Sequence, residues 1–345
     1  MGSSEFGALV VGAEAAGGRQ IGGLSLDERW RRTLAGAGVF DVEIVDVTEA
    51  AGAAGRLAAR GRTRVLLAVR GLATDPESVR ALLAPGSEAV RAENAEIGVV
   101  PVSAIGSRLD SSEPGRLAPL DDCVPMTMPG VVARIDSPAE ARSAGSELVR
   151  RHNRKPTDGL VARRLIRPFS GILSRALLPI GISPTAVSIL AFVVTLAAAG
   201  LIATGTVAGL VLGGVLVQLG STLDCVDGEL ARAALRTSQR GARLDTMLDR
   251  YADLAIVLGL VVAAGMTEAA WTWGFWGAAA VLLVPYAHAV MPEHPRGVMS
   301  RDVRLLGFAV IAVAQLPLVG LAVLTVLVHV DVAILALRHL LRDQG

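Results

Sequence analysis

Four aspartates gather in one short stretch of the chain, which starts at residue 223 and reads LDCVDGELARAALRTSQRGARLDTMLD. Asp224 and Asp227 are three residues apart, and Asp245 and Asp249 are four apart. Each spacing places two carboxylates on one face of a helix. A short basic turn, 236–240, separates the two pairs, so we expect two antiparallel neighbouring helices. The four carboxylates would then converge near the ends of these helices.

Carboxylate-rich, all-oxygen sites suit hard divalent cations such as Mg²⁺, Mn²⁺ or Ca²⁺. Two such ions can bridge a diphosphate and stabilise the charge on a leaving oxygen. Gly228 and Gly241 would let a ligand approach the backbone, and Arg232 offers a fixed charge for phosphate oxygens. Two alternatives stay open: carboxylates lining the path of a divalent-cation transporter, and a structural salt-bridge cluster with Arg232 and Arg243. A scaffold whose soluble domain binds a partner is a third.

The helices that carry these aspartates are expected to lie in a membrane. Apolar residues make up 52% of the 345 residues and charged residues 19%, and the charges concentrate in the first half. This distribution indicates a soluble domain followed by a membrane domain. Six spanning segments are predicted, at about Pro184–Ala203, Val207–Leu223, Leu244–Ala264 and Trp271–Val290, with the run Leu305–Leu337 divided in two near Gln315–Pro317.

Arginines are dense in alternate connections between these segments, which by the positive-inside rule places both termini and the aspartates on the cytoplasmic side of the cell membrane. Residues 160–181 precede the first segment and have apolar residues at helical spacing. We expect a juxtamembrane amphipathic helix in the membrane interface, whose basic residues meet anionic headgroups, rather than a surface helix of the soluble domain. Its arginines are Arg163, Arg164, Arg167 and Arg175.

Residues 7–135 alternate short apolar strands with helical stretches, which predicts an α/β domain around a mostly parallel sheet. The predicted strands are Ala8–Val11, Val42–Val47, Arg64–Val69 and Ile97–Val102, and the predicted helices are Leu26–Gly36, Glu49–Ala59 and Pro76–Leu83. Ser107–Pro129 is predicted as loop. The expected domains are 1–136, a linker and interfacial helix at 137–181, and an all-α transmembrane domain at 182–345.

The aspartate stretch resembles the signature of the CDP-alcohol phosphotransferase family, Asp-x-x-Asp-Gly-x-x-Ala-Arg, eight residues, Gly-x-x-x-Asp-x-x-x-Asp, at every position. The resemblance implies that Asp224, Asp227, Asp245 and Asp249 hold two Mg²⁺ or Mn²⁺ ions. It further implies that Asp249 is the general base for an acceptor hydroxyl, which attacks the β-phosphorus of a CDP-linked donor and expels CMP. The nucleotide-binding residues would be Asp224, Gly228, Ala231, Arg232 and Gly241. Pro184, Thr185 and Ser188 stand where the family often carries Pro-Asn-x-x-Thr.

The acceptor is expected to be a phosphorylated polyol, because family members that use inositol phosphate carry an Asp-Arg step comparable to Asp249-Arg250. Arg250, Arg301 and Arg304 would bind its phosphate, although membrane topology alone could also explain arginines at these positions. The donor is CDP-diacylglycerol or CDP-inositol, in phospholipid or phosphodiester biosynthesis. The family resemblance also implies a homodimer.

The N-terminal domain resembles sugar-phosphate nucleotidyltransferases in layout, but Gly17, Gly18 and Arg19 only hint at the G-x-G-x-R loop and the usual lysine is missing. The fusion resembles the bifunctional inositol-phosphate cytidylyltransferase and di-inositol-phosphate phosphate synthase group. We expect the cytidylyltransferase site to be inactive. The net charge of +1 indicates no nucleic-acid partner, and Cys123 and Cys225 are expected to be free thiols. No secretory signal is expected, and the opening MGSSEF resembles a cloning remnant.

Overall fold

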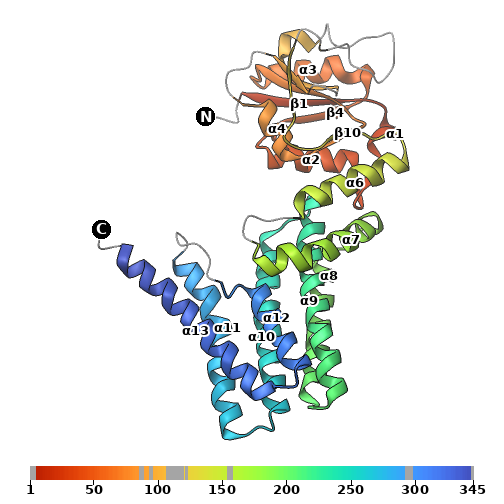
Figure 1. Cartoon of the computed structure of the whole chain (residues 1–345). Coiled ribbons are helices and arrows are strands. Elements are labelled where there is room, and N and C mark those ends of the chain that lie inside the picture. The colour runs from red at the N-terminus through yellow and green to blue at the C-terminus, as the bar shows by residue number, and fades with distance from the viewer. Residues whose placement is uncertain are drawn as a thin grey trace. The chain divides into compact units, whose positions relative to one another are not determined.

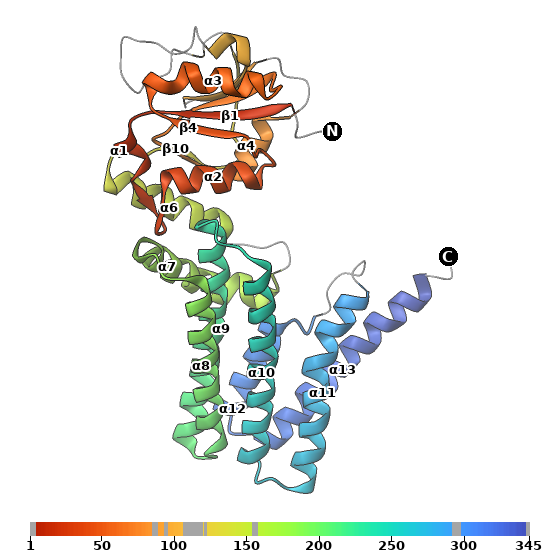
Figure 2. The same ribbon diagram turned by 180° about the vertical axis from the view of Figure 1, so that it is seen from behind.

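The computed structural model describes residues 5–84, 89–92, 96–105, 120, 123–153, 158–291 and 298–342 (Figures 1 and 2). The chain divides into two compact units. The N-terminal unit comprises Met1–Arg151 with Arg175–Gly181 and Ala233–Leu235, and the helical unit comprises His152–Ser174, Ile182–Arg232 and Arg236–Gly345.

A six-stranded sheet forms the core of the N-terminal unit. Its strand order is β4-β1-β5-β8-β7-β9, with parallel pairing between β1 and its two neighbours β4 and β5. β8 is antiparallel to both β5 and β7, and β7 is parallel to β9, so the sheet is mixed rather than mostly parallel as predicted. For β7 and β8 the reason is local, because these two strands are joined by too few residues for the crossover that parallel strands need. The strands are β1 (Phe6–Val11), β4 (Val42–Val45), β5 (Arg64–Val69), β7 (Val90–Ala92), β8 (Ile97–Pro101) and β9 (Val124–Met126).

The predicted helices of this unit are confirmed as α2 (Leu26–Gly36), α3 (Ala50–Ala59) and α4 (Pro76–Leu82). Both figures show α3 on one face of the sheet and α2 with α4 on the other. The helix starts follow from the sequence, since the Ser25 and Asp75 side chains accept hydrogen bonds from the first turns of α2 and α4. The remaining elements are α1 (Glu14–Gly17), β2 (Gln20–Ile21), β3 (Leu24–Ser25), η1 (Val47–Glu49), β6 (Leu72–Thr74), η2 (Val102–Ala104), β10 (Val132–Arg134) and α6 (Pro138–His152).

The loop predicted for Ser107–Pro129 lies largely outside the described residues. Within it, Val124–Met126 forms strand β9, which corrects the prediction at that point. A proline in the middle of this strand is compatible with its place at the edge of the sheet.

The helical unit contains α8 (Pro184–Ala203), α9 (Val207–Ala233), α10 (Gln239–Ala263), α11 (Glu268–Val290), α12 (Arg301–Val313) and α13 (Pro317–Arg342). Of these, α8, α9, α11 and residues 317–341 of α13 are long and apolar enough to cross a membrane. α10 carries too many polar residues in its first half, and the 13 residues of α12 reach only about 20 Å. The expected division near Gln315–Pro317 is confirmed by the end of α12 and the start of α13. The count of six spans stays a prediction.

The segment before α8 is helical throughout, as a π-helical turn (η3, Ala162–Ile166), α7 (Arg167–Leu177) and a 3₁₀ turn (η4, Leu178–Ile180). It covers most of the predicted amphipathic helix at 160–181. Its location at a membrane surface stays a prediction.

Helices α8 and α10 pack closely, as do α11 and α13 (Figure 2). Gly259 of α10 lies against the backbone of α8, where an added Cβ atom would meet the carbonyl oxygen of Ala199 at 2.6 Å. Small residues permit this kind of approach between membrane helices. The turn between α9 and α10 is closed by Ser238, whose hydroxyl accepts from the Gly241 amide and caps α10. This turn makes α9 and α10 neighbours and so brings their aspartates together.

Candidate active site

Three aspartates of the motif meet between α9 and α10. One carboxylate oxygen from each of Asp224, Asp245 and Asp249 lies within 4.8 Å of the other two. Asp227 is nearly buried and accepts a hydrogen bond from the hydroxyl of Ser188 on α8. Helical spacing predicted that all four carboxylates converge, and three of them lie within this distance, where they offer only oxygen ligands.

Arg301, the first residue of α12, supplies positive charge to this cluster. Its Nη1 atom lies 2.9 Å from Asp224 Oδ2 and 3.0 Å from Asp249 Oδ1. Carboxylates in a mostly apolar helical unit need such a counter-charge. Binding of an acceptor phosphate by Arg301 stays a prediction, and what the structure shows is its contact with the aspartates.

Asp253 gathers the three arginines that were predicted to bind the acceptor. It lies one helical turn after Asp249 and its side chain is only 1% exposed. Its carboxylate lies 3.3 Å from Arg301, 3.5 Å from Arg304 and 3.8 Å from Arg250. The sequence signal for this residue was its i, i+4 relation to Asp249, but its role as the common partner needed the position of α12.

Two cavities border the aspartates within the helical unit. The smaller has a volume of about 290 Å³ and contains most of the predicted nucleotide-binding residues, with the start of α8 as one wall. The larger, about 550 Å³, contains the three arginines around Asp253. Asp227, Gly228 and Asp245 line both, so ligands in the two cavities would meet at the same carboxylates. The smaller cavity is lined by Gly228, Ala231, Arg232 and Gly241 together with Pro184, Thr185 and Ser188, and the larger by Asp224, Asp249, Arg250, Arg301 and Arg304.

Two of the predicted nucleotide-binding residues, Asp224 and Arg232, line different cavities. Asp224 was assigned to the nucleotide, yet it lines the larger cavity and not the smaller. Arg232 lines the smaller cavity, where its Nε and Nη2 atoms donate to the backbone carbonyl of His152 at 3.2 and 3.0 Å.

A buried ionic cluster beside the motif was missed by the sequence analysis. Arg167 is only 4% exposed, although it was expected among arginines that meet headgroups, whereas Arg163 and Arg164 are exposed. It donates to both carboxylate oxygens of Asp158 and to Glu229. Burial by itself would lower the pKa of Arg167, but these carboxylates outweigh it and raise the pKa above its ordinary value. The only local signal was an acidic residue, Glu229, at a variable position inside the motif.

No model of a known protein family matches the chain. Among curated proteins, it is 40% identical over 179 residues to a bifunctional IPC transferase and DIPP synthase of Rubrobacter xylanophilus, covering 50% of this chain and 40% of that protein. It is 36% identical over 168 residues to the corresponding protein of Thermococcus kodakarensis, covering 49% of this chain and 37% of that protein. It is also 37% identical over 117 residues to a phosphatidylinositol phosphate synthase of Mycobacteroides abscessus, covering 34% of this chain and 50% of that protein. The chain thus spans half or less of the length of these relatives.

Among solved structures, the chain is similar to Mycobacterium tuberculosis phosphatidylinositol phosphate synthase (PgsA1) with CDP-DAG bound. The sequence identity is 24% and the TM-score 0.42, over 50% of this chain and 92% of that chain. A structure of the same enzyme in complex with manganese and citrate gives 24% identity and a TM-score of 0.41, over 50% of this chain and 87% of that chain.

Proposed function

Since this chain is a relative of the CDP-alcohol phosphotransferases, we propose that it transfers a substituted phosphate group from a CDP-linked donor to an alcohol and releases CMP. The observation that carries the proposal is the convergence of Asp224, Asp245 and Asp249 where two cavities meet. One cavity can take the donor and the other the acceptor, with the reacting groups brought to the same carboxylates.

The oxygen atoms of the aspartates suit a divalent cation as ligands. The three aspartates offer oxygen ligands within 4.8 Å of one another, which suits Mg²⁺ or Mn²⁺, and Asp227 is the fourth proposed ligand. We propose two ions. When bound, they would neutralise the diphosphate and the charge that develops on the departing CMP.

The other steps fall to the chain's own residues. The smaller cavity would hold the cytidine end against Gly228, Ala231 and Gly241, with Arg232 near the diphosphate. Asp249 would take the proton of the acceptor hydroxyl while the new oxygen–phosphorus bond forms and the bond to the CMP oxygen breaks. Asp249 lines the larger cavity, through which the acceptor would approach.

The acceptor we propose is an inositol phosphate or a similar polyol phosphate. The larger cavity presents Arg250, Arg301 and Arg304, whose planar guanidinium groups suit phosphate oxygens. The names of the relatives, DIPP synthase and phosphatidylinositol phosphate synthase, agree with this chemistry. The donor would be CDP-diacylglycerol or CDP-inositol, and the pathway phospholipid or phosphodiester biosynthesis.

We also propose a domain organisation, a location and an oligomeric state for the chain. Residues 1–136 would form a cytoplasmic nucleotidyltransferase-like domain without activity, 137–181 a linker with an interfacial helix, and 182–345 the transmembrane transferase domain. Both termini and the site would face the cytoplasm, and the protein would act as a homodimer in the cell membrane.

The test is CMP release by the purified protein in detergent, with CDP-diacylglycerol and CDP-inositol as donors and inositol phosphate and glycerol phosphate as competing acceptors. Mass spectrometry identifies the product. CMP should form only with Mg²⁺ or Mn²⁺, and its formation should stop after chelation.

Asp249→Asn should lower the rate of CMP release by about 10²–10⁴-fold or more, because it removes both a general base and a metal ligand. The control is Glu268→Gln, at an exposed position. A protein that moves Mg²⁺ into liposomes yet never forms CMP would be a transporter instead.

A further inference from the structure

We propose that Glu229 is a positioning residue, which acts with Arg167 and Asp158 as a latch between helices α9 and α7. Through this latch, α7 would fix the segment that orients Arg232 at the wall of the smaller cavity. The inference rests on the proposed function for the identity of the ligand in that cavity, a cytidine nucleotide.

The environment of Glu229 indicates a built contact rather than an incidental one. Its side chain is fully buried and accepts three hydrogen bonds, all from α7. The donors are Arg167 Nη1 at 2.7 Å and the hydroxyls of Ser170 and Ser174, each at 2.6 Å. These residues are spaced three and four apart, so they share one face of the helix. A single face of α7 therefore satisfies the whole carboxylate.

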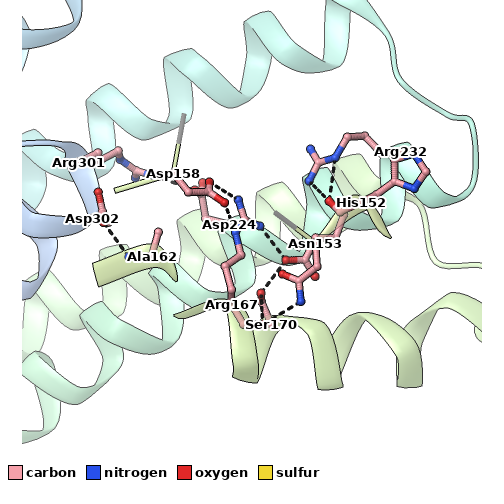
Figure 3. Close-up of polar contacts among 11 residues, drawn as sticks. His152, Asn153, Asp158, Ala162, Arg167, Ser170, Asp224, Arg232, Arg301 and Asp302 are labelled. Carbon is pink, nitrogen blue, oxygen red and sulfur yellow. Dashed lines mark hydrogen bonds and ion pairs between the residues drawn. The ribbon is translucent and has the colours of Figure 1, made fainter. Parts of the chain in front are cut away.

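Asp158 completes the latch on the other side of Arg167. The Arg167 guanidinium donates to the two Asp158 oxygens at 2.9 and 2.7 Å (Figure 3). Its third nitrogen donates to Oε1 of Glu229. A planar guanidinium held by two carboxylates has little rotational freedom. The position of α7 along α9 is thereby defined.

The latch connects to Arg232 through His152, the last residue of α6, and Asn153, which follows it (Figure 3). The Asn153 side-chain amide donates to the Arg167 carbonyl at 3.1 Å. The carbonyl of His152 accepts from Nε and Nη2 of Arg232. This carbonyl orients the Arg232 guanidinium without neutralising its charge, which leaves the charge for an anionic ligand in the cavity.

A purely stabilising role for the latch is the alternative. Buried ion pairs contribute little net stability compared with apolar groups of similar volume, so stability alone is a weak reason for three buried charges beside the motif. The two roles differ in one respect. A positioning role requires that the effect of Glu229 on ligand binding depend on Arg232, and a stabilising role does not.

The experiment measures the affinity for CMP in the presence of Mg²⁺ by calorimetry on the full chain in detergent. Glu229→Gln and Arg167→Gln should each weaken CMP binding about tenfold. The double variant should bind CMP as tightly as the single variant that has the lower affinity. In an Arg232→Ala background, Glu229→Gln should cause no further loss. Glu268→Gln, at an exposed site, is the matched control.

The proposal is overturned if folded Glu229→Gln binds CMP within twofold of the parent, or if its loss persists in full in the Arg232→Ala background. Size exclusion in detergent checks folding. Should Glu229→Gln not fold, Ser174→Ala is the second variant, because it removes only one of the three donors. A loss of CMP affinity of about threefold in Ser174→Ala supports the latch, and unchanged affinity overturns it.

The latch and the proposed function can fail separately. A parent protein that binds CMP without turning over any CDP-alcohol would overturn the proposed function, and the latch could still be measured. A parent that binds no CMP would overturn both.

Discussion

The carboxylates of the site differ in their partners, and these partners decide what each carboxylate can do. Asp227 is held by a hydroxyl, whereas Asp224 and Asp249 share the guanidinium of Arg301. Asp253 is surrounded by arginines. Because Arg301 neutralises two of the proposed metal ligands, a divalent cation and this guanidinium compete for the same negative charge.

Arg301→Gln should therefore tighten binding of Mn²⁺ while weakening use of the acceptor. Removing a positive charge 2.9 and 3.0 Å from two ligand oxygens makes the site more negative, and we expect an affinity gain of about tenfold. Titration of free Mn²⁺ by electron paramagnetic resonance measures it. Arg250→Gln is the control and should have a smaller effect, since its nearest nitrogen lies 3.7 Å from Asp249. Weaker Mn²⁺ binding in Arg301→Gln would show that no such competition exists.

The helices hold the site through close packing of small residues as well as through polar contacts. Gly259 lies on α10, ten residues after Asp249. It contacts the backbone of α8 at Ala199. By contrast, Gly200 of α8 has open space where its side chain would be. The two glycines therefore differ in what they tolerate, although both lie in helices of the same unit.

Gly259→Leu should destabilise the protein and reduce CMP release, because α8 and α10 must separate to admit the side chain. Overpacking of this kind costs about 1–3 kcal/mol, which corresponds to a melting temperature lower by roughly 5 °C. Thermal denaturation in detergent, with CMP release beside it, measures both effects. Gly200→Leu is the matched control and should change neither. Equal losses in the two variants would contradict the packing argument.

The connection between α12 and α13 contains a second element-level feature. Gln315 is exposed and has φ of +60°, a left-handed conformation that is unfavourable for residues with a side chain. Gln315→Gly should therefore raise the stability by about 0.5 kcal/mol, seen as a small rise in melting temperature, whereas Gln315→Ala should not. A loss of stability with glycine would mean that the glutamine side chain makes a contact worth more than this strain.

At the scale of the whole molecule, the question is what the N-terminal unit contributes. The side chains of Asp27 and Arg70 pack against its glycine-rich segment at Gly17. An added Cβ atom on Gly17 would meet Asp27 at 2.2 Å and Arg70 at 2.5 Å. Asp27 and Arg70 form an ion pair there. The space beside Gly17 is thus filled by an internal salt bridge. The inactivity of this unit stays a prediction.

The full chain should accordingly release no pyrophosphate from CTP and inositol phosphate, under conditions in which it releases CMP from a CDP-alcohol. A coupled pyrophosphate assay tests this, with CMP release as proof that the preparation is active. Asp27→Ala with Arg70→Ala tests the filling directly and should still give no product, because the usual lysine is missing as well. Pyrophosphate formed by the parent chain would show that the N-terminal unit retains activity.

The sequence alone determined those features of this protein that depend on neighbours along the chain. The i, i+3 and i, i+4 aspartates, the capped turn at Ser238 and the break between α12 and α13 follow from helix geometry and from local residue preferences. The strands β1, β4, β5 and β8 and the helices α2, α3 and α4 were predicted for the same reason, whereas β7 and β9 were not. Tertiary structure decided the rest: the antiparallel pairing of β5 with β8, Arg301 on Asp224 across 77 residues, and Arg167 buried against Glu229 across 62. These contacts depend on which strands pair and which helix faces pack together. That is decided by the burial of apolar surface over the whole chain rather than by spacing within one helix.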